Sequence, residues 1–273
     1  MRSRAGVVAV VIALALTGCT TGPSLTDVHV DALSTSSGAL AGGTELTLTG
    51  TGLDVITAVN FGDATAPVQD SSAESLTVVT PASADFADGD VEVSVSAGGA
   101  SSGTGLSFTY EVVTPVDKEM QYLFTFWEDW NTDEYGSLEN TDCVNFTSQG
   151  LQARGWGMDD RADDAGWWFW KGEVTGAKNY SKAWISSTAL RNYLTTRPDL
   201  ATMSTDPADA AIGDVLQFDW DDSGDPDHTA VVSKIQDGKL SVVQHSGAAK
   251  YLTVDRMLAD HPGSTFYVWH LGV

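Results

Sequence analysis

Residues 140–155 read NTDCVNFTSQGLQARG, and this segment predicts a short helix with its own start and stop signals. Thr141 or Asp142 can accept hydrogen bonds from the free N–H groups of the first turn, and Gly155 favours an end there. Cys143 then lies at the helix N-terminus, where the peptide dipoles favour a thiolate and the amides can hold an oxyanion. Cys143 is therefore a candidate nucleophile, with a small buried apolar side chain as the plain alternative.

A candidate general base begins a well-marked strand. Residues 227–235, DHTAVVSKI, are rich in β-branched side chains and lead to Asp237-Gly238, a preferred hairpin turn. Counting pairs outward from this turn sets His245 opposite Ala230, which points His228 and His245 to the same face of the hairpin. A second polar group beside a histidine base is what a catalytic triad needs in order to fix the tautomer.

The first part of the chain differs in composition. No Lys or Arg occurs between Thr20 and Val112, and short alternating runs recur between Gly, Asp and Ser turns. Such runs predict half-buried strands, and several of them at close spacing predict an all-β sandwich over residues 27–111. The expected strands are Thr44–Thr49, Ala58–Phe61, Ser75–Val79, Val91–Val95 and Leu106–Tyr110.

A second domain is expected over residues 118–273, after a linker at residues 112–117. Helical spacing replaces alternation there: Met120, Leu123 and Trp127 lie on one face of a predicted amphipathic helix. Tryptophans also become frequent. They favour a buried core or groove wall over a sugar-stacking platform.

The N-terminus has the pattern of an export signal. Two arginines precede an apolar run at residues 5–16 that is too short to span a bilayer comfortably. The sequence Leu16-Thr17-Gly18-Cys19 follows and resembles the lipobox of bacterial lipoproteins. It implies a signal peptide at residues 1–18, lipidation of Cys19, and an anchor and linker at residues 19–26. The protein is then expected on the extracytoplasmic face of the cell membrane, held by its lipid; an ordinary cleaved signal is the alternative.

Charge narrows the choice of partners. The 273 residues include 37 acidic and 14 basic side chains, a net charge of -23, which argues against binding nucleic acid phosphates. No cofactor is expected. Asp219, Asp221, Ser223 and Asp225 place oxygens at alternate positions, as in the first half of a calcium loop. Ala230 stands where such a loop needs its glutamate, so a solvated loop is favoured over calcium.

Four segments of the first domain follow one another in a known order: GGTELTLTGTGL (42–53), VNFG (59–62), TVVTP (77–81) and FTY (108–110). In this order they resemble the IPT/TIG family of immunoglobulin-like modules. Three segments of the second domain carry its candidate chemistry: DCVNFTSQ (142–149), GDVLQF (213–218) and DHTAVV (227–232). They resemble the putative amidase domain family, which is related to the NlpC/P60 and CHAP cysteine peptidases. The resemblances imply a multidomain protein, an all-β immunoglobulin-like sandwich followed by an α+β papain-like domain of the NlpC/P60 type.

The second resemblance also implies a site. Carried over by position, Cys143 is the nucleophile, His228 the base and His245 the orienting group, with the adjoining Gln244 as the alternative third residue. The implied function is hydrolysis of an amide bond in peptidoglycan or its stem peptides, by an amidase or an endopeptidase. Two alternatives remain open from the sequence: a surface binding lipoprotein with a catalytically silent papain-like domain, and a protein-directed cysteine protease.

Overall fold

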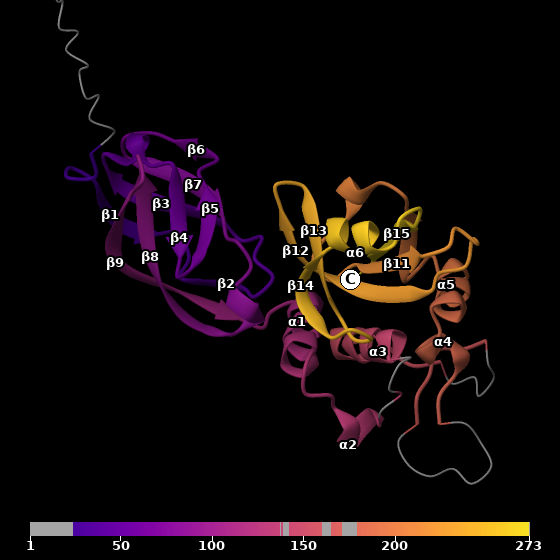
Figure 1. Ribbon diagram of the computed structural model, residues 1–273. Coiled ribbons are helices and arrows are strands. Elements are labelled where there is room, and N and C mark those ends of the chain that lie inside the picture. Colours follow the sequence, from indigo (N-terminus) through magenta and orange to yellow (C-terminus); the bar gives the residue numbers. More distant parts are fainter. Residues whose placement is uncertain (1–23, 137, 139–141, 160–164, 171–178, 273) are drawn as a thin grey trace, which may run out of the picture.

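The computed structural model describes residues 24–136, 138, 142–159, 165–170 and 179–272. The expected signal peptide and Cys19 lie outside the described residues. A β-rich region is followed by a region that mixes helices and strands (Figure 1). Within the described part of the chain, no helix is both long enough and apolar enough to cross a membrane.

The N-terminal domain contains two sheets. One has the strand order β1-β3-β7-β6 and the other the order β2-β9-β8-β4-β5. Neighbouring strands in these two sheets run antiparallel, except for the parallel pair of β2 and β9. The strands are β1 (His29–Leu33), β2 (Ser37–Ala39), β3 (Glu45–Thr51), β4 (Ala58–Phe61), β5 (Ala64–Pro67), β6 (Asp70–Ser71), β7 (Ser75–Val79), β8 (Gly89–Ala97) and β9 (Ala100–Glu111), with 3-10 turns η1 (Leu53–Val55) and η2 (Ala84–Phe86).

Alternation explains these strands. In β7, Leu76 and Val78 are buried while their neighbours are only partly covered, and β3 and β4 follow the same period of two. The inward side chains form an apolar core, in which the Phe61 and Phe108 rings meet edge to face at 5.3 Å. All five expected strands are confirmed, as β3, β4, β7, β8 and β9.

The C-terminal domain has one antiparallel sheet in the order β10-β15-β11-β12-β13-β14. Its strands are β10 (Ala201–Ser204), β11 (Val215–Asp219), β12 (His228–Gln236), β13 (Lys239–Gln244), β14 (Ala249–Thr253) and β15 (Thr265–Leu271). Its helices are α1 (Pro115–Phe126), α2 (Thr132–Tyr135), α3 (Cys143–Arg154), α4 (Lys182–Ile185), α5 (Ser187–Thr195) and α6 (Val254–Asp260), with the 3-10 turn η4 (Pro207–Asp209).

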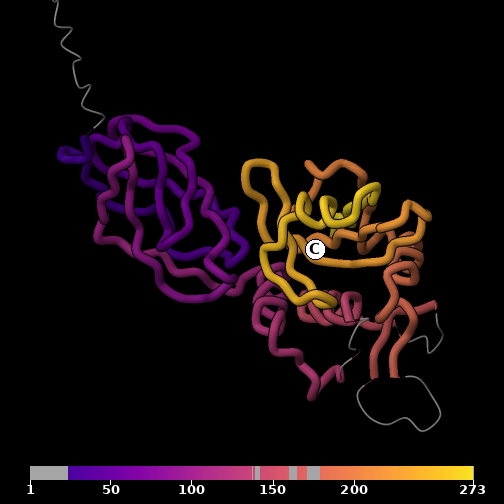
Figure 2. Tube along the Cα trace, in the orientation of Figure 1, coloured from indigo at the N-terminus to yellow at the C-terminus, as the bar shows by residue number. Residues whose placement is uncertain are grey.

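The two faces of this sheet are covered by different helices (Figures 1 and 2). On one face, Val231 and Val243 belong to the same core cluster as the apolar residues of α1 and α3. On the other face, Val232 and Val242 pack with Val254 and Met257 at α6. The sheet is therefore buried on both sides, which explains its nearly continuous apolar strands.

Helix α3 is buried on almost all sides. Gly150 permits its close approach to α1, because a Cβ at this position would lie 2.8 Å from Leu123 Cδ2. The predicted end is confirmed: Gly155 caps the helix with φ 110°. The predicted start is correct in position, but the Asp142 side chain makes no capping hydrogen bond, and Thr141, the alternative cap, lies outside the described residues.

A bulge in the β12–β13 hairpin shows that the expected face of His245 was wrong. Gln236 pairs with Lys239 as predicted, but the register shifts between Val232 and Lys234. Continuing the shifted register sets Gln244 opposite Ala230, where His245 was expected. Side chains alternate between the two faces of a strand. This one-residue shift therefore places Gln244 on the face where His245 was expected, and His245 on the opposite face.

The two domains are joined through the start of α1. This helix begins at Pro115, inside the expected linker, and Thr114 and Asp117 form a reciprocal capping box. The fully buried Asp117 carboxylate also accepts a hydrogen bond from Ala41 N–H of the first domain at 2.7 Å. The rings of Phe86 and Phe124 pack across the same interface at 4.8 Å.

Candidate active site

The structure brings Cys143 and His228 to the wall of one cavity of about 700 Å³. Cys143 is the first residue of α3, and His228 is the first residue of β12, which packs against α3. The cavity is lined by Cys143, Ile185, Ser186, Ser187, Trp220, Pro226, Asp227, His228, Gln244, Ser246, Leu252, Met257, Asp260 and His261. His245 is not among these residues.

Cys143 is 8% exposed. Burial raises the pKa of the Cys143 thiol, and hydrogen bonds to the sulfur from Thr229 N–H, the Ser187 side chain and Val144 N–H oppose this rise. The expectation that the helix N-terminus makes a thiolate is therefore too simple, since loss of water outweighs the donors that surround the sulfur.

His228 is 6% exposed, and Gln244 holds one of its ring nitrogens. Gln244 Nε2 donates to the Gly247 carbonyl oxygen at 3.0 Å, which turns Gln244 Oε1 toward His228 Nε2 at 2.9 Å. His228 Nε2 is then the donor, so Nδ1 is the nitrogen left to accept a proton. Burial lowers the pKa of His228, although the bond to Gln244 opposes this effect. Burial thus shifts the pKa values of Cys143 and His228 toward their uncharged forms, the thiol and the neutral imidazole.

His245 does not orient His228. It is 1% exposed, and its two ring nitrogens face the Asp142 carboxylate at 2.5 Å and the Phe126 carbonyl oxygen at 2.9 Å. Both ring nitrogens of His245 are therefore occupied by these partners, and neither is available to hold His228. The ring also stacks on Phe146 at 3.7 Å and on Trp130 at 4.6 Å. The bulge in β12 explains this correction, because it turns His245 away from the cavity.

The polar residues that surround Cys143 in the sequence anchor α3. Asn145 donates to Asp142 and accepts from the Trp184 indole N–H at 2.8 Å. Ser148 accepts from the Trp167 indole N–H at 3.0 Å. Since both indoles are fully buried, these tryptophans belong to the core, as the sequence favoured, and they fix the position of the helix that carries Cys143.

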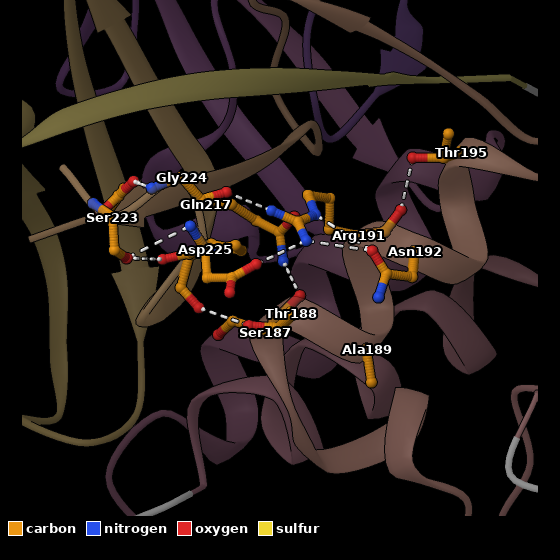
Figure 3. A network of polar contacts seen from close by, with 12 residues as sticks. Ser187, Thr188, Ala189, Arg191, Asn192, Thr195, Gln217, Ser223, Gly224 and Asp225 are labelled. Carbon is orange, nitrogen blue, oxygen red and sulfur yellow. Dashed lines mark hydrogen bonds and ion pairs between the residues drawn. The ribbon is translucent and has the colours of Figure 1, made fainter.

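The acidic side chains of the loop before His228 are grouped differently from what the calcium-loop pattern predicted. Asp227, rather than Asp225, joins Asp219 and Asp221, with ligand atoms within 4.8 Å of one another. Asp225 instead pairs with Arg191 of α5 at 2.7 Å (Figure 3). The buried Asp219 carboxylate accepts hydrogen bonds from backbone amides of the same loop. These bonds shape the loop that leads into β12.

Several residues of the cavity were not singled out by sequence reasoning. His261 is exposed but stacks on Trp220 at 4.1 Å and lines the cavity. Ser187 also lines it, and no local motif marks this serine. His270 lies on β15 outside the cavity, with its side chain 55% exposed and its Nδ1 2.9 Å from Asp214.

Two family models match separate parts of the chain. The sequence model of the family described as "Putative amidase domain" matches residues 116–269, and that of the "IPT/TIG domain" matches residues 29–110. The uncharacterized protein YhbB of Bacillus subtilis (strain 168) is 24% identical over 173 residues, which are 61% of this chain and 52% of that protein. The chain thus spans about half the length of the curated relative it matches.

Solved structures resemble parts of the chain only weakly. The extracellular region of plexin A4 is 24% identical over 32% of this chain and 7% of its own, with a TM-score of 0.28. An auxiliary nutrient binding protein from Bacteroides ovatus is 28% identical over 31% of this chain and 21% of its own, with a TM-score of 0.26. The match to the amidase family covers more than half of the chain, and this protein therefore belongs to the putative amidase domain family, with an IPT/TIG domain before the amidase domain.

Proposed function

We propose that this protein is a cysteine hydrolase that cleaves an amide bond in peptidoglycan, from a lipid anchor on Cys19 at the extracytoplasmic face of the membrane. The observation that carries the catalytic part is the cavity that the buried Cys143 and His228 side chains share, with Nε2 of His228 held by Gln244. Family membership suggests amide hydrolysis. The substrate, the anchor and a papain-like relationship to NlpC/P60 peptidases rest on the sequence resemblances.

The proposed reaction uses only groups of this chain and water. Cys143 Sγ attacks the amide carbonyl carbon while His228 Nδ1 takes the thiol proton. When the tetrahedral intermediate collapses, the C–N bond breaks and His228 gives this proton to the leaving amine, which leaves a thioester on Cys143. Water then attacks the thioester carbonyl carbon while His228 accepts one of its protons. The C–S bond breaks, His228 returns this proton to Cys143 Sγ, and the carboxylic acid product leaves.

In this proposal Gln244 replaces His245 as the third residue. Its Oε1 accepts the Nε2 hydrogen of His228, so it fixes the tautomer in which Nδ1 can act as a base. Asp142 and His245 support the segments that carry the catalytic residues. Their buried ion pair connects the start of α3 with the end of β13, because Asp142 immediately precedes Cys143 and His245 follows Gln244.

The test is digestion of purified, insoluble peptidoglycan, with mass spectrometry of the released products. We expect the wild type to release new amines and soluble muropeptides. Cys143→Ala and His228→Ala should each lower the rate by roughly a thousandfold or more, because each removes a group that acts in bond cleavage. His270→Ala is the matched control, since His270 lies outside the cavity. The masses of the products identify the cleaved amide.

Three outcomes would contradict the proposal. Release that persists in Cys143→Ala would exclude this cysteine as the nucleophile. A wild type that binds peptidoglycan without releasing products would favour the surface binding protein, and cleavage of protein substrates alone would favour the protease.

A further inference from the structure

The proposed reaction leaves one buried serine of the cavity unused. Ser187 is the first residue of α5, is 6% exposed, and lines the same cavity as Cys143. Behind it, side chains from β11, β12 and β15 form a chain of hydrogen bonds that ends at the Ser187 hydroxyl. The direction of each bond in this chain can be established from the donors and acceptors present.

Gln217 on β11 sets the direction at the start of the chain. Its side chain is fully buried, and its Oε1 accepts from the Trp269 indole N–H at 2.8 Å and from the Tyr267 hydroxyl at 3.2 Å. An indole N–H can only donate, so the Gln217 amide has a single orientation. Its Nε2 consequently donates to the Ser187 carbonyl oxygen at 2.8 Å (Figure 3). The same Nε2 also donates to Thr229 Oγ1 at 3.2 Å.

The Thr229 hydroxyl in turn fixes the hydrogen-bond direction of the Ser187 hydroxyl. Because Thr229 Oγ1 accepts from Gln217, its own hydrogen is available, and it donates to Ser187 Oγ at 2.9 Å. Ser187 Oγ therefore acts as an acceptor toward Thr229, and its own hydrogen needs another acceptor. Cys143 lines the same cavity as Ser187, and the Ser187 side chain is one of the groups that lower the pKa of its thiol, which makes the Cys143 sulfur the candidate acceptor.

We infer that Ser187 is a further catalytic residue, whose hydroxyl donates a hydrogen bond to Cys143 Sγ and holds the thiolate that forms when His228 takes the proton. Gln217 and Thr229 are positioning residues, because they act through the direction of the Ser187 hydroxyl. The inference rests on the proposed role of Cys143 as nucleophile, but its test measures the thiol alone. Failure of one can therefore be told from failure of the other.

The donor matters because the sulfur is buried. Water cannot stabilise a thiolate in this position, so the charge depends on fixed donors, and a hydrogen bond to an ionised group is about twice as strong as a neutral one. Ser187 is one of the groups that oppose the rise in the pKa of Cys143 caused by burial. Its removal should raise this pKa further.

The test is the pH dependence of alkylation of Cys143 by iodoacetamide, which needs no substrate. The full chain is used, and the modification is followed by mass spectrometry of the peptide that carries Cys143, so that Cys19 does not contribute. Ser187→Ala should raise the midpoint pH of the alkylation-rate profile by about one pH unit. Below that midpoint, alkylation should then be about tenfold slower than in the wild type. Thr188→Ala is the matched control, because its hydroxyl, on the next residue of α5, donates to the Pro226 carbonyl oxygen.

A Ser187→Ala profile that coincides with the wild type, in a protein with native near-ultraviolet circular dichroism, would overturn the inference. If this variant loses its native spectrum, Thr229→Val takes its place. Loss of the hydroxyl that orients Ser187 should shift the midpoint upward by a smaller amount, and an unshifted profile would again overturn the inference. A shift in a protein that hydrolyses no peptidoglycan would preserve the role of Ser187 toward the thiol and reject the proposed function.

Discussion

The two domains differ in what they bury. Within the described residues of the first domain, the buried polar side chains are Thr80 and Ser83, and the rest of the interior is apolar. The second domain buries a far larger set that includes Asp142, His228 and His245. A buried polar group lowers stability unless its hydrogen bonds are satisfied, so a domain that only has to fold gains little from such groups. Their concentration around Cys143 separates the site from the supporting sandwich.

The largest effect should come from breaking a buried ion pair. His245→Ala leaves the Asp142 carboxylate buried without its cation, and we expect a loss of about 3–5 kcal/mol in the free energy of unfolding. His29→Ala is the matched control in the first domain, because the His29 and Asp31 side chains are 73% and 60% exposed. This exposed pair should contribute less than about 1 kcal/mol. Urea unfolding followed by circular dichroism measures both, and equal losses would contradict the comparison.

A cavity in the sandwich should separate stability from activity. Leu46→Ala removes a fully buried side chain from the first domain and should cost about 3 kcal/mol, without a change in the hydrolysis rate of the folded protein. Leu190→Ala is its counterpart in α5, the helix that carries Ser187, and should lower both stability and rate. Urea unfolding and peptidoglycan release are measured on the same preparations. A slower folded Leu46→Ala protein would show that the sandwich takes part in catalysis.

The acid limb of the pH–rate profile should report His228. Burial holds the pKa of His228 below its ordinary value of 6.5, and only the neutral ring accepts the thiol proton. As the pH is lowered, the hydrolysis rate should therefore stay constant through pH 6.5. Once the pH drops below the lowered pKa of His228, the rate should fall about tenfold per pH unit. Gln244→Ala should move this limb to still lower pH, because the hydrogen bond from His228 to Gln244 favours the protonated ring. A limb at or above 6.5 would contradict the buried environment of the base.

Sequence reasoning succeeded where the signal was local. Alternating side chains are enough to predict β4 and β7, and Gly155 is enough to predict the end of α3. It misplaced His245, because the bulge near Ser233 carries no glycine or proline and the segment VVSKI has the pattern of an uninterrupted strand. Ser187 was also missed. Its place beside Cys143 depends on the packing of α5 against the sheet, and no spacing within the sequence records that contact.

The smallest effect should come from the exposed ion pair between the domains. Lys250 on β14 lies 2.7 Å from Asp85 of the first domain, with the side chains 30% and 54% exposed. Solvent screens this pair, so Lys250→Ala should cost less than about 1 kcal/mol. A double-mutant cycle with Asp85→Ala isolates the coupling, which we expect to be a few tenths of a kcal/mol. The structure assigns the contact between the domains to the hydrogen bond from Ala41 N–H to the buried Asp117 carboxylate. Coupling above about 1 kcal/mol between Lys250 and Asp85 would contradict this assignment.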